Sequence, residues 1–153
     1  MEIRETGLRD LKIIKPRIFK DDRGYFFESY NKGVYRDAGI DLTFVQDNQS
    51  RSVYGVVRGL HYQIEPKAQT KLVRVLDGSI WDVAVDLREN SPTFLKWMGV
   101  ELSSDNYLQL LIPKGFAHGF SVLSETAVVL YKCDELYAPD HEAGIRYDDP
   151  DIG

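Results

Sequence analysis

Four side chains of types that enzymes use for proton transfer stand in segments rich in β-branched and aromatic residues: His61, Lys71, His118 and Tyr131. Each type also has an ordinary structural role. A strand lysine is usually solvated, a buried tyrosine usually donates one hydrogen bond in the core, and a single histidine is a weak signal. Taken one at a time, these residues leave both catalytic and structural roles open.

Arg58 and His61 belong to the segment 56–62, whose composition indicates a strand. In a regular strand, residues of odd and even number face opposite sides, so Arg58 and His61 would point apart. Either a bulge at Gly59 re-aims one of them, or the two side chains serve different ends of a site.

Two acids, Asp82 and Asp86, share one face of a later strand with Ala84. They are either solvated or placed to orient a histidine or to hold a lysine inside a barrel. The third histidine, His141, stands in a polar loop, where we expect it to be solvated and to have no role.

Two elements resemble the metal-binding elements of the cupin family. Gly55 and His61 are separated by five residues, and residues 113–118 read PKGFAH, which ends in His118. Yet Gln63 occupies the second ligand position of the first element, and no acid follows at the expected place. Two of four ligands remain, whereas catalytic divalent metals usually have at least three protein ligands. We therefore expect no metal.

Short strand-like segments separated by turn residues cover almost the whole chain and predict a single all-β sandwich or barrel. The segment 31–38 is the one expected helix, which Asn31 can cap and Gly39 can end. Asp77-Gly78 predicts a tight hairpin. Exposed edge strands need cover, and pairing with a second subunit commonly provides it. The expected strands are residues 11–18, 26–30, 44–49, 56–62, 71–76, 79–85, 96–102, 108–112, 118–122 and 127–133.

The composition limits the class of partner. The 153 residues carry a formal net charge of −5, which favours neither nucleic acid nor an anionic membrane, although a local basic cluster can still bind an anionic small molecule. One cysteine cannot form an internal disulfide, the charged start of the chain is unlike a signal peptide, and no apolar stretch reaches the roughly 20 residues that span a bilayer. We expect a cytoplasmic protein.

Seven motifs occur in an order that resembles dTDP-4-dehydrorhamnose 3,5-epimerases, from about residue 10 to the end of the chain. They are residues 22–28 (DRGYFFE), 46–50 (QDNQS), 58–63 (RGLHYQ), Lys71, 82–86 (DVAVD), 112–120 (IPKGFAHGF) and Tyr131. The resemblance implies one cupin-type jelly-roll domain over residues 1–153 with one or few short helices. It also implies a homodimer, an isomerase of dTDP-L-rhamnose synthesis, a nucleotide-sugar substrate, and no metal or cofactor.

The resemblance also implies roles for individual residues. His61 is expected to remove a proton from the sugar, Tyr131 to return one to the other face, and Lys71 to stabilise the C4 oxygen of the enolate between these steps. The remaining expected substrate contacts are Arg23, Glu28, Gln46, Asn48, Arg58, His118 and Glu142, with the two arginines suited to the diphosphate.

One departure from the family pattern leaves alternatives open. Members commonly continue beyond the point where this sequence stops, and that tail carries an aspartate that orients the catalytic histidine. Either the chain is shortened or another acid takes the place of this aspartate, and Asp82 and Asp86 are the candidates. The alternatives are a position-specific epimerase or a ketoisomerase acting on a related sugar nucleotide, and a catalytically silent cupin that only binds one.

Overall fold

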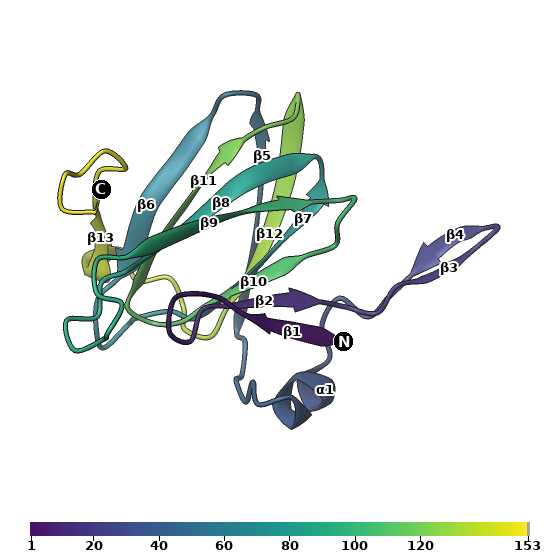
Figure 1. The fold of residues 1–153 in the computed structure, drawn as a ribbon, viewed down its shortest axis with the longest axis horizontal. Helices are drawn as coiled ribbons and strands as arrows, with labels where there is room; N and C mark the ends of the chain where they lie inside the picture. Colours follow the sequence, from purple (N-terminus) through teal and green to yellow (C-terminus); the bar gives the residue numbers. More distant parts are fainter. Residues whose placement is uncertain (153) are drawn as a thin grey trace.

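The computed structural model describes residues 1–152 and contains two antiparallel β-sheets packed face to face (Figure 1). Neighbouring strands are mostly distant in sequence, as in a jelly roll, which confirms the expected all-β cupin-type fold. The six-stranded sheet runs in the order β1 (Glu2–Glu5), β2 (Lys12–Lys15), β10 (Gln109–Ile112), β7 (Lys71–Asp77), β12 (Thr126–Cys133) and β5 (Gln46–Val53). The five-stranded sheet runs in the order β13 (Glu142–Gly144), β6 (Val57–Gln63), β11 (Phe116–Val122), β8 (Ser79–Asp86) and β9 (Trp97–Ser103).

Alternate residues of both sheets fill the space between them. Val73 and Val129 come from the six-stranded sheet, and Ile80 and Phe120 come from the five-stranded sheet. Because side chains alternate along a strand, the same inward faces continue past this apolar cluster. Lys71 and Tyr131 occupy the inward positions beyond Val73 and Val129. Asp82 and His118 occupy inward positions between apolar residues of the cluster. The packing of the core therefore aims chemically useful side chains at one end of the interior.

The turn at Asp77-Gly78 joins the two sheets and is not a hairpin. Strand β7 pairs with β10 and β12, whereas β8 pairs with β9 and β11, so the predicted hairpin is wrong. The positive φ of Gly78 suits the sharp change of direction, and a Cβ atom there would lie 2.2 Å from the carbonyl oxygen of Thr126. The dipeptide marked a tight turn correctly, but the partners of the flanking strands are set by the whole sheet.

Helix α1 (Lys32–Asp37) lies where the sequence predicts it. The side chain of Asn31 accepts a hydrogen bond from the amide of Val34 at 3.1 Å, and Gly39 has a positive φ just after the helix. Its buried residue is Tyr35, whose hydroxyl donates to Gln109 of β10, while Val34 is exposed. No helix among the described residues is long and apolar enough to cross a membrane.

Several short strands are not predicted from the sequence. Strands β1 and β13 extend the two sheets. The strand predicted at residues 26–30 is wrong, because the observed strand ends at Phe26 and residues 27–30 are not in a strand. Phe26 is instead the last residue of a separate hairpin, formed by β3 (Phe19–Asp21) and β4 (Gly24–Phe26). This hairpin projects from the body of the molecule (Figure 1). Strands of three or four residues carry too little alternation to be recognised.

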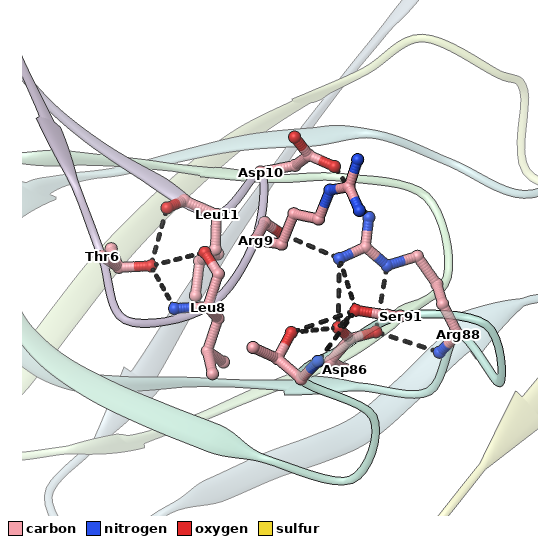
Figure 2. A network of polar contacts seen from close by, with 9 residues as sticks. Thr6, Leu8, Arg9, Asp10, Leu11, Asp86, Arg88 and Ser91 are labelled. Atoms are coloured by element: carbon pink, nitrogen blue, oxygen red, sulfur yellow. Dashed lines mark hydrogen bonds and ion pairs between the residues drawn. The ribbon is translucent and has the colours of Figure 1, made fainter.

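An ionic network around the buried Asp86 fastens the end of β8 to the first loop (Figure 2). The Arg88 guanidinium donates to Asp86 at 3.0 Å and to Asp10 at 2.9 Å. The hydroxyls of Ser91 and Thr93 each donate to Asp86 at 2.6 Å. Burial opposes ionisation of Asp86, but the hydrogen bonds from Arg88, Ser91 and Thr93 outweigh it and lower the pKa of this carboxyl to about 2.

This network predicts a specific acid sensitivity. The unfolded chain takes up a proton at the ordinary carboxyl pKa of 3.8, whereas the folded chain does so only near 2. The stabilisation by ionised Asp86 is therefore complete above the unfolded pKa and is lost as the pH falls. We expect the stability difference between wild type and Asp86→Asn to shrink by about 2 kcal/mol between about pH 4 and pH 2. Urea unfolding at several pH values measures it, and parallel curves would contradict the assignment.

Candidate active site

A bulge at Gly59 brings Arg58 and His61 to the same face of β6. His61 pairs with His118 of β11, but Arg58 pairs with Phe120, so three steps along β6 match two steps along β11. The extra residue reverses the alternation between Arg58 and His61. Of the two alternatives that the sequence left open, the structure selects the bulge, and both side chains face the space between the sheets.

Glycine is required at this bulge for two reasons. Gly59 has a φ of +118°, and a Cβ atom there would lie 2.5 Å from the Cα of Gly119 and 2.7 Å from the carbonyl oxygen of His118. Gly119 is equally confined, because its Cβ would lie 2.6 Å from the carbonyl oxygen of Arg58. The close approach of two backbones therefore sets the direction of Arg58.

The two inward histidines have different surroundings. His118 is buried, and its Nε2 lies 2.6 Å from Oδ1 of the fully buried Asp82. His61 borders a groove lined by Glu142 and by residues 143–148. Desolvation, followed by the charge of Lys71 and by His118, lowers the pKa of His61 below its ordinary value of 6.5, while Glu142 opposes the shift. His61 is therefore held in the neutral form that a base requires.

The six-stranded sheet supplies a lysine and a tyrosine to the same end of the interior. The Nζ of Lys71 lies 5.4 Å from the centre of the Tyr131 ring, and this ring lies 6.5 Å from that of His118. Burial lowers the pKa of Lys71 and raises that of Tyr131; Asp82 and Glu142 partly counter the shift at Lys71. The phenol of Tyr131 is therefore protonated near neutral pH.

The edge strand β5 adds a polar row to this end. Nε2 of Gln46 donates to Oδ1 of Asn48 at 3.0 Å, and a hydrogen bond from Asn48 partly offsets the raised pKa of Tyr131. Farther along the strand, Ser52 accepts a hydrogen bond from Nε of Arg58 at 2.8 Å. Ser52 was not recognised from the sequence, although it shares its inward face with Gln46 and Asn48 by alternation.

Glu142 is joined to β5 through Tyr137. The Tyr137 hydroxyl donates to Glu142 at 2.9 Å, and its backbone amide donates to Oε1 of Gln46 at the same distance. Tyr137 precedes the short 3₁₀-helix η1 (Pro139–His141), and nothing in its sequence context identified it. These contacts place Glu142 beside the site.

Eight of the ten expected site residues lie around this end of the interior, and two do not. Arg23 lies at the tip of the projecting hairpin, where it bonds to Asp21 at 2.7 Å, and Glu28 accepts from Asn31 at 2.9 Å (Figure 1). The eight are His61, Lys71, Tyr131, Gln46, Asn48, Arg58, His118 and Glu142.

Two further expectations are changed by the structure. The prediction that Asp82 or Asp86 orients His61 is wrong, because Asp82 bonds to His118 and Asp86 belongs to the Arg88 network. His141 is half-buried, with a buried Nδ1 that has no hydrogen-bond partner among residues 1–152, so it is not the solvated residue expected. Cys133 shares the inward face of β12 with Tyr131, and burial raises the pKa of its thiol to about 11.

Gln63, at the second ligand position of the first cupin-like element, forms hydrogen bonds with backbone groups. Nε2 of Gln63 donates to the carbonyl oxygens of Lys67 and Leu136, and its Oε1 accepts from the amide of Ala138. Gln63 therefore fastens loops to β6. Within residues 1–152, no three His, Cys, Asp or Glu side chains are grouped so that they could hold a metal ion.

Comparisons with known proteins agree on one family. A family model described as dTDP-4-dehydrorhamnose 3,5-epimerase matches residues 5–153. The dTDP-4-dehydrorhamnose 3,5-epimerase of Methanothermobacter thermautotrophicus is 54% identical over 97% of this chain and 80% of its own length.

Solved structures extend this agreement to the fold. The Bacillus anthracis dTDP-4-dehydrorhamnose 3,5-epimerase with TDP and PPi bound has a TM-score of 0.96 at 53% identity, covering 99% of this chain and 87% of its own. A dTDP-6-deoxy-D-glucose-3,5-epimerase from Legionella pneumophila, in complex with dTDP-4-keto-L-rhamnose, has a TM-score of 0.95 at 53% identity, covering 99% and 80%.

The bulge yields a prediction about stability. We expect Gly59→Ala to lower the free energy of unfolding by more than about 2 kcal/mol, because strain at positive φ adds to overlap with β11. Gly55→Ala is the matched control, since Gly55 also has a positive φ but a Cβ atom there meets nothing within 4 Å. It should cost about 1 kcal/mol. Equal losses in urea unfolding would show that backbone strain alone requires Gly59.

Proposed function

The chain belongs to the dTDP-4-dehydrorhamnose 3,5-epimerase family, and we propose that it inverts C3 and C5 of dTDP-4-dehydro-6-deoxy-D-glucose to give dTDP-4-dehydro-L-rhamnose. The observation that carries the proposal is the arrangement of His61 and Tyr131. They come from opposite sheets, face one interior, and have pKa values shifted toward a neutral base and a protonated acid.

Proton removal is the task proposed for His61. The C4 ketone acidifies the C–H bonds at C3 and C5, since loss of either proton gives an enolate. The lowered pKa of His61 keeps the imidazole free to accept that proton at neutral pH. Activity should accordingly fall only as the pH drops below the ordinary histidine value of 6.5.

Lys71 is proposed to stabilise the enolate oxygen. Its ammonium lies beside the Tyr131 ring on a half-buried side chain, and a positive charge held in a partly desolvated site stabilises a developing negative charge. Burial lowers the pKa of Lys71, so the stabilising charge should be lost at a pH below the ordinary lysine value of 10.5.

Inversion requires that the proton return to the opposite face of the sugar. Tyr131 stands on the sheet opposite His61, and its phenol can deliver a proton to carbon and regain one from solvent. The cycle closes when His61 releases to solvent the proton that it removed from carbon.

The remaining inward polar residues are proposed to bind the nucleotide sugar. The Arg58 guanidinium is exposed at the edge of the site, with Nε bonded to Ser52, and its terminal nitrogens suit a diphosphate. The other proposed contacts are Gln46, Asn48, His118 and Glu142.

The test is exchange of the sugar protons with solvent. With dTDP-4-dehydro-6-deoxy-D-glucose in D₂O, NMR should show deuterium entering both C3 and C5. We expect His61→Ala to slow both exchanges at least about 100-fold, because the base is lost. Tyr131→Phe should retain exchange but lose inversion, because His61 can still return a proton to the face from which it took one.

His141→Gln provides the matched control, since His141 is a histidine outside the proposed machinery; its exchange rates should stay within about twofold of wild type. Exchange at C3 alone would support a position-specific epimerase. Binding of the nucleotide sugar without any exchange would support a silent binding protein.

We also propose that the chain forms a homodimer in which the hairpin of one protomer reaches the site of its partner. The hairpin projects from the body and exposes apolar rings, with Phe26 67% and Tyr25 60% accessible (Figure 1). Arg23 and Glu28 are expected to contact substrate, yet they lie apart from the interior of their own chain. A second copy would reconcile these observations.

Mixing two inactive variants tests this dimer. His61→Ala and Arg23→Ala protomers should recover activity together, because one site of each mixed dimer regains both residues. Random mixing leaves about a quarter of the sites intact. Protomer exchange in the mixtures is demonstrated separately. If protomers exchange but activity does not recover, the hairpin is not shared between protomers.

A cytoplasmic location completes the proposal. It is supported by the free, buried Cys133 and by a nucleotide-linked substrate.

A further inference from the structure

Asp82 is a buried carboxylate whose hydrogen bonds are only half satisfied. Its side chain is fully buried, and Oδ1 lies 2.6 Å from Nε2 of His118. Oδ2 is also buried but has no hydrogen-bond partner among residues 1–152. Leaving a buried carboxylate oxygen without a donor is costly, so a contribution to folding does not explain this residue.

The surroundings of Asp82 favour an apolar residue. Its neighbours on the inward face of β8 are Ile80 and Ala84, both fully buried in the main apolar cluster. Replacing a buried ion pair by packed apolar side chains is often neutral or stabilising. A carboxylate at this position therefore serves the site at the end of the cluster.

His118 stands between the proposed base and the proposed acid. It is the register partner of His61 across β6 and β11, and its ring lies 6.5 Å from that of Tyr131 at an interplanar angle of 70°. A carboxylate accepts but does not donate, so the hydrogen bond to Asp82 places a proton on Nε2. Nδ1 is then the ring nitrogen left for the substrate.

We propose that Asp82 is a positioning residue that fixes the orientation of His118 and holds a proton on its Nε2, so that Nδ1 faces the C4 oxygen of the substrate beside Lys71 and donates to it when the ring carries a proton on both nitrogens. This inference rests on the proposed epimerase function. Hydrogen bonding of a second carboxylate oxygen is not needed for this role. A carboxylate that holds a histidine by one nitrogen also balances the positive charge when the other nitrogen carries a proton.

The Asp82 carboxylate also acts on Lys71 across the interior. Burial lowers the pKa of Lys71, and attraction by Asp82 opposes that shift. The other titratable groups that face Lys71 are Tyr131 and Cys133 of β12, His61 of β6 and Glu142 of β13. Removing the charge of Asp82 should therefore lower the pKa of Lys71 further. The loss of activity on the basic side should then occur at a lower pH than in wild type.

Asp86 offers a matched control on the same strand. It is also fully buried and charged, but its oxygens are bonded to Arg88, Ser91 and Thr93 at the far end of β8. Asp86→Asn removes the same charge from the same strand while leaving His118 and Asp82 untouched.

The kinetic experiment compares Asp82→Asn and Asp86→Asn with wild type over pH. We expect Asp82→Asn to lower kcat about 10- to 100-fold, to change KM less than about threefold, and to move the basic limb of the profile to lower pH. Asp86→Asn should keep the wild-type kcat and both limbs of the pH profile, and should change only the free energy of unfolding. An Asp82→Asn protein that folds and keeps the wild-type kcat and profile overturns the inference.

A second measurement does not depend on how the variants fold. Long-range ¹H–¹⁵N NMR of the wild-type protein reports which ring nitrogens of His118 carry protons, with His118→Gln used to assign the signals. Protonated Nε2 is expected, and a bare Nε2 with Nδ1–H overturns the inference. If wild type exchanges neither sugar proton, the proposed function fails and the inference fails with it. Normal exchange that is insensitive to Asp82→Asn rejects the inference alone.

Discussion

Strands β6 and β11 approach so closely at Gly59 and Gly119 that neither position has room for a Cβ atom. The approach accompanies one extra residue in β6, and that residue reverses the side-chain alternation. Without it, Arg58 would face the outside of the sandwich while His61 faced the interior. The inward direction of Arg58 and its hydrogen bond to Ser52 therefore depend on this contact between two backbones.

The interior combines two environments that usually exclude one another. One end is a packed apolar cluster, and the other is a polar site built from the same inward faces. On β12 the transition occurs between Val129 and Tyr131, whereas on β8 Asp82 interrupts the cluster between Ile80 and Ala84. Low polarity at the boundary strengthens every charge in the site and makes unpaired charges costly. The Asp82–His118 pair and the shifted pKa of Lys71 both follow from that position.

The two acids of β8 show how position gives identical side chains different surroundings. Asp86 meets a guanidinium and two hydroxyls, which satisfy it fully and fasten the first loop to the sheet (Figure 2). Asp82 stands four residues earlier on the same face and meets one imidazole, and its Oδ2 has no donor among residues 1–152. The strand period brought both to the same face, but only their three-dimensional neighbours distinguish their roles.

The sequence by itself determined the all-β architecture, the capped helix and eight of the residues that gather in the site. Strand alternation, turn residues and the spacing of motifs are local, so they can be read along one chain. Only the tertiary structure decided that Asp77-Gly78 turns between sheets, that Asp82 holds His118 rather than His61, and that Arg58 faces inward. It also separated Arg23 and Glu28 from the interior of their own chain. These outcomes depend on which strands become neighbours and on how closely their backbones pack, and such contacts join residues far apart in the sequence.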